Sequence, residues 1–185
     1  MILDHIALLV AEIEPVLKRL ADLDLPAGEI ETFPGEGTRE VYLGDPKRPA
    51  LLLLLQPISE GPYARALAKR GPSLHHVAIQ VPDLNAFAGQ VKGWLLHPHS
   101  LESQRKANTL WFARPGVGTL LEVTSGKGGS GEGSVQVGVS LSDPELAPLL
   151  GLASAGGPVA GLEAAEDEAW IQVAGARRLL SELLA

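Results

Sequence analysis

The chain has 185 residues and a formal charge of −7, with 45% hydrophobic and 20% charged residues. This profile is typical of a globular protein with one large domain or two small ones. The sequence contains no cysteine, which excludes disulfides, thiolate nucleophiles and cysteine-ligated metal centres, so any metal must be bound by His, Asp, Glu or Gln.

Charge and hydropathy also restrict the partners of the protein. The acidic balance and the scattered Lys and Arg residues argue against nucleic acid, because phosphate binding needs clustered basic side chains. The longest apolar run, 50–55, is far shorter than the roughly 20 residues that span a bilayer, and the first residues do not resemble a signal peptide. We therefore expect a cytoplasmic protein that binds neither nucleic acid nor membrane.

The chain opens with an apolar segment that recurs in its middle. Residues 4–10 (DHIALLV) match residues 75–81 (HHVAIQV), and each copy predicts a short buried strand. An acidic residue follows each copy, Glu12 and Asp83, as is favourable at a helix N-terminus. The sequence therefore predicts a duplicated module that begins with a strand and a helix.

Three strand-like segments separated by Gly and Pro turns follow each helix. The predicted helices cover residues 12–23 and 83–92, and the strands cover 29–33, 38–43 and 51–56 in the first half and 95–97, 109–114 and 119–124 in the second. A connecting helix is expected over 63–70. The fold class is thus α+β, with two β-α-β-β-β modules at about 1–58 and 74–125.

The remaining third of the chain begins with a Gly/Ser-rich segment, 126–134 (GKGGSGEGS), which is typical of a linker and completes no phosphate-binding motif. Residues 135–185 form a C-terminal extension. Its first segment aligns with the openings of both modules and places Gln136 where His5 and His76 stand. We interpret the extension as a degenerate third module, closed by a helix over 176–184.

Three residues of the duplicated core can form a metal site. Strand alternation puts His5 on one face of its strand and His76 on the equivalent face of the second copy, and Glu122 lies in the last strand of the core. Taken singly, each histidine is explained as well by a hydrogen-bonded residue of the core, and Glu122 by a solvent-facing side chain on an edge strand. Their equivalent positions favour a divalent-metal site, because paired modules bring such positions together.

The other histidines have less specific roles. His75 precedes a ligand candidate and is expected to point to the opposite face, as a structural or surface residue. His97 and His99 flank Pro98 in a predicted loop, where solvated side chains are favoured over a metal pair.

Three segments carry a resemblance to the vicinal oxygen chelate superfamily: 3–7 (LDHIA), 74–78 (LHHVA) and 118–122 (GTLLE). Methylmalonyl-CoA epimerases are closest in pattern, because three segments are similar to theirs in order and spacing: 54–57 (LLQP), Lys69-Arg70-Gly71 before His75-His76, and 111–115 (WFARP). The resemblance covers residues 2–125.

This resemblance implies two modules around a half-barrel cleft, where a divalent ion (Mn, Co, Ni, Zn or Fe) chelates adjacent substrate oxygens. His5, His76 and Glu122 match metal ligands of the epimerases and of glyoxalase I. The fourth ligand falls on Leu53, which cannot coordinate a cation. Glu36 lies near the catalytic glutamate of the epimerases, within about one residue in the alignment.

The implied activity is metal-assisted proton abstraction next to a carbonyl, by an isomerase or lyase similar to methylmalonyl-CoA epimerase or lactoylglutathione lyase. Glu122 and Glu36 are the expected acid and base. The partners expected are a small-molecule substrate, with a thioester as one choice, and a second copy in a homodimer. Four basic residues are candidates to bind the phosphates of a CoA substrate: Lys69, Arg70, Arg105 and Lys106.

Two alternatives remain open. Leu53 favours a non-catalytic binding protein similar to the bleomycin-resistance proteins of the superfamily, whereas three retained ligands disfavour it. Two histidines and a carboxylate also resemble the iron site of extradiol dioxygenases. Their catalytic tyrosine falls on Phe112, and no histidine matches their catalytic one, so this activity is less favoured.

Overall fold

The computed structural model describes residues 1–100, 108–126, 135–140, 142–143, 147–155 and 157–185. Most of the predicted linker, together with Arg105 and Lys106, lies outside these residues. The described strands form one sheet of eight strands and one of four. None of the described helices has the length and apolar character needed to cross a membrane.

The two halves of the core repeat the same order of elements, and the helix α2 (Pro62–Arg70) connects them. The first half contains β1 (Ile2–Leu9), α1 (Ile13–Arg19), β2 (Glu31–Phe33), β3 (Thr38–Leu43) and β4 (Leu51–Pro57). The second half contains β5 (Ser73–Val81), α3 (Leu84–Gln90), β6 (Leu95–Leu96), β7 (Thr109–Ala113) and β8 (Leu120–Ser125). Both helices are shorter than predicted. The Asp83 carboxylate caps α3 by accepting from two backbone N–H groups, whereas Glu12 makes no side-chain cap on α1.

The eight-stranded sheet is built around a pseudo-twofold axis. Its order is β2-β3-β4-β1-β5-β8-β7-β6, so each half contributes four strands in mirrored order. β1 runs parallel to β4 and β5 runs parallel to β8, while β1 and β5 pair antiparallel at the centre. The sheet is open, with β2 and β6 at its edges. The predicted α+β fold with two paired β-α-β-β-β modules is confirmed.

The two faces of this sheet have different roles. The core face carries large apolar side chains, such as Ile6, Leu52 and Val77, in one cluster with residues of α1 and α3. Each such side chain stabilises the fold by about 1.5–3 kcal/mol when fully buried. The opposite face, which we call the site face, carries His5, His76 and Glu122. Part of it is covered by α2, whose residues pack on Ala7, Leu9, Leu53 and Leu55.

The C-terminal extension forms the second sheet. Its elements are β9 (Gln136–Ser140), α5 (Ala147–Leu150), a 3-10 helix η1 (Gly151–Ala155), β10 (Leu162–Ala165), β11 (Trp170–Val173), β12 (Ala176–Leu179) and α6 (Leu180–Leu184). The order in the sheet is β10-β9-β11-β12, in which the first strand of the extension pairs with its second and third. In the core modules the first strand pairs with the fourth instead. A degenerate third module therefore stays a prediction.

The predicted closing helix is wrong over its first half. Residues 176–179 form β12, and the helix α6 begins only at Leu180. Ala174 and Gly175, both with positive φ, make a tight turn that pairs β12 with β11. The Arg177 guanidinium then lies 4.0 Å from the centre of the Trp170 ring. The turn signal at Gly175 outweighs the apolar spacing that favoured a helix.

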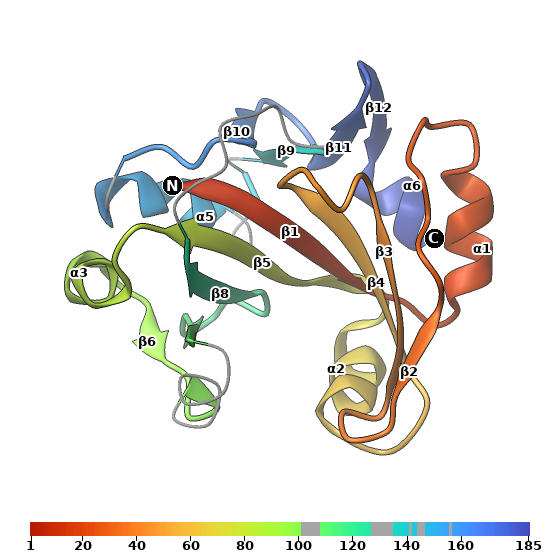
Figure 1. The fold of residues 1–185 in the computed structure, drawn as a ribbon, viewed down its shortest axis with the longest axis horizontal. Helices are drawn as coiled ribbons and strands as arrows, with labels where there is room; N and C mark the ends of the chain where they lie inside the picture. The colour runs from red at the N-terminus through yellow and green to blue at the C-terminus, as the bar shows by residue number, and fades with distance from the viewer. Residues whose placement is uncertain (101–107, 127–134, 141, 144–146, 156) are drawn as a thin grey trace.

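The extension packs on the core face, on the side of the sheet away from α2 (Figure 1). Its apolar residues, among them Val137 and Ile171, belong to the same hydrophobic cluster as Ile6. The Leu3 N–H donates to the Ala160 carbonyl at 2.9 Å, and the Arg19 guanidinium donates to the Leu183 carbonyl at 3.0 Å. The extension and the core module therefore share one hydrophobic core.

Candidate metal centre

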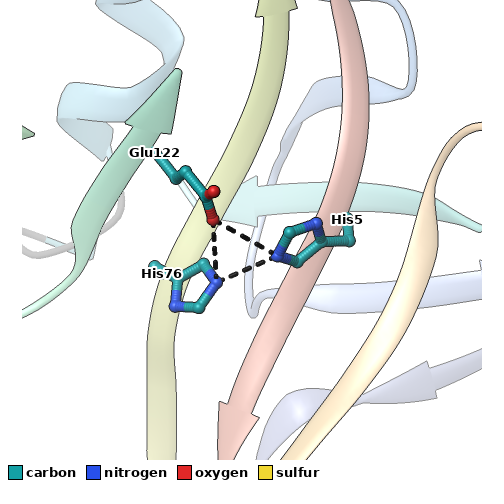
Figure 2. A group of neighbouring side chains, drawn as sticks. All are labelled: His5, His76 and Glu122. Carbon is teal, nitrogen blue, oxygen red and sulfur yellow. Dashed lines mark hydrogen bonds and ion pairs between the residues drawn. The ribbon is translucent and has the colours of Figure 1, made fainter. Parts of the chain in front are cut away.

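Three of the predicted site residues lie together on the site face. His5 projects from β1, His76 from β5 and Glu122 from β8, and their side chains point toward one another (Figure 2). The two Nε2 atoms are 3.0 Å apart, and Glu122 Oε2 lies 3.6 Å from the first and 3.5 Å from the second. These separations fit three donors around one ion at about 2.1 Å from each.

Sheet register explains why these residues converge. His5 pairs with Ala78 and Ala78 pairs with Glu122, so His5 and Glu122 lie in one row with a small residue between them. Ala7 lies opposite His76 in the same way. Each alanine follows its ligand histidine by two residues and therefore lies on the same face, where its small side chain leaves room for the facing histidine or carboxylate.

A one-residue bulge precedes each histidine. Between β1 and β5 the pairing skips Asp4 on one strand and His75 on the other, which are equivalent positions of the two modules. A bulge redirects a side chain that regular alternation would send to the opposite face. Asp4 Oδ2 lies 2.9 Å from His5 Nδ1, and His75 Nδ1 lies 2.9 Å from His76 Nδ1. The expectation that His75 points away from the site is wrong, because strand alternation does not hold at a bulge.

The aromatic surroundings follow the same symmetry. Tyr42 of β3 meets the His5 ring edge-on at 5.7 Å between ring centres, and Trp111 of β7 meets the His76 ring at 5.0 Å. Tyr42 pairs with Leu53, and Trp111 pairs with Glu122. Leu53 is therefore the structural counterpart of Glu122, and it is buried against α2. The two modules differ at this position, where one supplies a carboxylate and the other an apolar side chain.

Burial determines the charge states of the site. His5 and His76 are buried, and 16% of the Glu122 side chain is exposed. Burial, with the neighbouring His5 and His75, lowers the pKa of His76 well below its ordinary value, so its imidazole is neutral. Burial raises the pKa of Glu122, with further contributions from Asp4 and Glu36. A neutral imidazole offers a nitrogen lone pair to a metal, and a nearby cation stabilises the charged form of a buried carboxylate. The donor set therefore fits a divalent ion.

The second predicted acid or base, Glu36, lies apart from the three donors. It is exposed in the turn between β2 and β3, and the Tyr63 hydroxyl donates to its carboxylate at 3.3 Å. Sequence reasoning missed another carboxylate, Glu40 of β3, which interacts electrostatically with both His5 and Glu36. Thr38 Oγ1 donates to Glu40 at 2.6 Å, and burial raises the pKa of Glu40. The period-two spacing of Glu40 and Tyr42 along β3 could have identified both as neighbours of the site.

The remaining histidines lie in the loop after β6. The His97 N–H donates to the Trp111 carbonyl, and His97 Nδ1 accepts from the His99 N–H at 3.2 Å. These contacts organise the loop, and neither histidine joins the three donors. Phe112, where the dioxygenases have a tyrosine, lies in the core against Phe87.

Together, the paired modules and the two-histidine, one-carboxylate group define the fold of the vicinal oxygen chelate superfamily, and the resemblance seen in the sequence is confirmed. The solved structures to which the chain is similar include methylmalonyl-CoA epimerases and a hypothetical protein. No protein-family model and no curated protein matches the chain.

The hypothetical protein, from Bacillus halodurans, is 27% identical with a TM-score of 0.55, and the match covers 70% of this chain and 96% of that one. The epimerase from Mycobacterium tuberculosis is 25% identical with a TM-score of 0.50, covering 68% of this chain and 88% of its own. A Streptomyces coelicolor epimerase variant in complex with 2-nitronate-propionyl-CoA is 20% identical with a TM-score of 0.52, over 69% and 99% of the two chains.

Proposed function

We propose that the protein is a metal-dependent isomerase or lyase that abstracts a proton next to a carbonyl. The observation that carries this proposal is the convergence of His5, His76 and Glu122, with donor atoms 3.0 to 3.6 Å apart. Three donors leave coordination positions open for a substrate. A bound divalent ion supplies Lewis-acid polarisation of the substrate carbonyl.

The residues of the chain bind the ion and transfer the proton. His5 and His76 would each present an Nε2 lone pair to the ion, and Glu122 would supply the negative charge. Glu122 is also the proposed first acid or base, because it lies beside the open coordination positions where the substrate would bind. Glu36 is the proposed second group, and Tyr63 orients its carboxylate. A base on one side of the substrate and an acid on the other would complete an epimerisation.

The substrate is proposed to be a small carbonyl compound, with a CoA thioester as the first candidate. The similarity to an epimerase solved in complex with methylmalonyl-CoA supports this choice. Lys69 and Arg70, at the end of α2, are the described basic residues proposed for its phosphates. We also retain the expectation of a homodimer.

Hydrogen exchange tests the reaction directly. The protein loaded with Co²⁺ would be incubated in D₂O with methylmalonyl-CoA, or with the glutathione hemithioacetal of methylglyoxal, and deuterium at carbon followed by NMR. The proposal expects exchange with at least one substrate and its loss in Glu122→Gln. Glu36→Gln should reduce it, whereas Glu163→Gln, which removes an exposed charge on β10, should not. Binding of both compounds without deuterium exchange would reject the proposed enzymatic activity.

A non-catalytic binding protein is the second candidate, and Leu53 favours it. This side chain is 3% exposed and lies where the counterpart of Glu122 would supply a fourth donor. A site that has lost a ligand can retain binding without chemistry. Tight substrate binding without exchange is the result that this candidate predicts.

A further inference from the structure

We propose that Asp4 and His75 are positioning residues that fix the two ligand histidines with Nε2 free to coordinate. This inference rests on the metal site proposed above and adds which residues preorganise it. The geometry that carries it is the pair of equivalent bulges, each of which places the residue before a histidine against Nδ1 of that histidine.

A neutral imidazole carries its proton on either nitrogen, and only the nitrogen without the proton can bind a metal. An acceptor at Nδ1 keeps the proton there and leaves the Nε2 lone pair free. Asp4 Oδ2 is such an acceptor for His5, at 2.9 Å. His75 Nδ1 lies at the same distance from His76 Nδ1, and it accepts from a His76 Nδ1–H when the proton of His75 is on Nε2.

Each positioning residue is in turn fixed by a neighbour. The Gln80 side chain donates to the second oxygen of Asp4, which leaves Oδ2 toward His5. The Tyr63 ring lies against the His75 ring, with 4.9 Å between their centres. The rings of the two ligand histidines stand nearly perpendicular, at 79°, and their Nε2 atoms face each other at 3.0 Å. The site is thus preorganised from both sides of the pseudo-twofold axis.

The two acceptors differ in strength. A carboxylate accepts a charge-assisted hydrogen bond, roughly twice as strong as a bond between neutral groups. Asp4 therefore makes His5 the stronger donor, while the neutral His75 supports His76 less. The structure thus predicts unequal contributions from two equivalent positions of the duplicated modules.

Metal affinity and the visible spectrum of bound Co²⁺ test this inference. Asp4→Ala and His75→Phe each remove the acceptor, and the second keeps the ring that contacts Tyr63. Loss of such an outer partner weakens metal binding by roughly 10 to 100-fold. We expect weaker Co²⁺ binding and an altered Co²⁺ spectrum in both variants, with the larger loss in Asp4→Ala. Glu163→Gln is the control for removal of one negative charge.

The conservative variants Asp4→Asn and His75→Asn retain an acceptor near Nδ1 and should recover part of the lost affinity. Circular dichroism would check that every variant is folded. If Asp4→Ala does not fold, the two Asn variants still test the inference. Wild-type affinity and spectrum in Asp4→Ala and His75→Phe would overturn the inference, as would Asn variants as weak as these two. Failure of the wild-type protein to bind Co²⁺ would instead reject the proposed metal site itself.

Discussion

Asp4 and His75 occupy equivalent bulges on β1 and β5, and each contacts Nδ1 of the histidine that follows it at 2.9 Å. Both modules therefore have the same three-part arrangement. A bulged residue contacts Nδ1 of the ligand histidine, and an aromatic ring from the third strand of the module lies edge-on against that histidine. Among the candidate metal ligands, the modules differ where the fourth strand reaches the site, at Leu53 and Glu122. This difference converts a symmetric fold into an asymmetric site with open coordination positions.

Restoring a carboxylate at position 53 should tighten metal binding and destabilise the metal-free protein. Leu53→Glu places a fourth donor opposite Glu122, and one added ligand worth about 1.4 kcal/mol gives a tenfold gain in affinity. Without the ion, the unpaired carboxylate in the apolar cluster under α2 should cost about 3 kcal/mol or more. Calorimetric titration and thermal unfolding would measure both effects.

Leu55→Glu is the matched control for that substitution. Leu55 belongs to the same cluster but lies two residues further along β4. This variant should lose stability without any gain in metal affinity. Equal affinities for the two variants would contradict the assignment of position 53 to the fourth ligand.

Stability of the metal-free protein should decrease as the pH falls from 6.5 to about 4. Burial lowers the pKa of His75 from 6.5 to about 4. Within this window the unfolded chain binds a proton that the folded chain does not, so protonation favours unfolding. At about 1.4 kcal/mol for each pH unit, His75 alone accounts for a loss of up to about 3 kcal/mol.

Urea unfolding of the wild type and of His75→Phe across this window would check the pH effect. The variant lacks the titrating group and should show a smaller decrease in the free energy of unfolding. The same decrease in both proteins would show that His75 is not its source.

Removal of the extension should unfold the core. Residues 1–125 alone would expose the face that Val137, Val139 and Ile171 cover. Because each buried apolar side chain contributes about 1.5–3 kcal/mol, the loss approaches the whole stability of a typical domain, about 5–15 kcal/mol. Light scattering and circular dichroism should show aggregation or lost structure.

Arg178→Ala provides the comparison for truncation. Arg178 forms an exposed ion pair with Asp22, of the kind that contributes about 0 to 1 kcal/mol. This variant should remain folded with nearly unchanged stability. A soluble, folded 1–125 fragment would contradict the shared core.

The sequence was sufficient to predict the duplicated modules and the convergence of His5, His76 and Glu122, because the repeat fixes which positions become neighbours across the pseudo-twofold axis. It was insufficient for the role of His75, since a bulge reverses the face that strand alternation assigns. The period-two spacing of Glu40 and Tyr42 places both on one face of β3, but which face meets the site depends on the pairing of β3 with β4. The pairing in the extension depends on the tight turn at Gly175 and on packing against the core.

The most direct test of the metal site is a Co²⁺ titration of the purified, metal-free protein and of His76→Ala. Replacing a ligand should weaken binding by more than the roughly 100-fold that loss of an outer partner can cost. His97→Ala, in the loop after β6, is the control and should bind as the wild type does. We predict one equivalent of Co²⁺ bound by the wild type and none by His76→Ala. One equivalent bound by His76→Ala, or none by the wild type, would contradict the account.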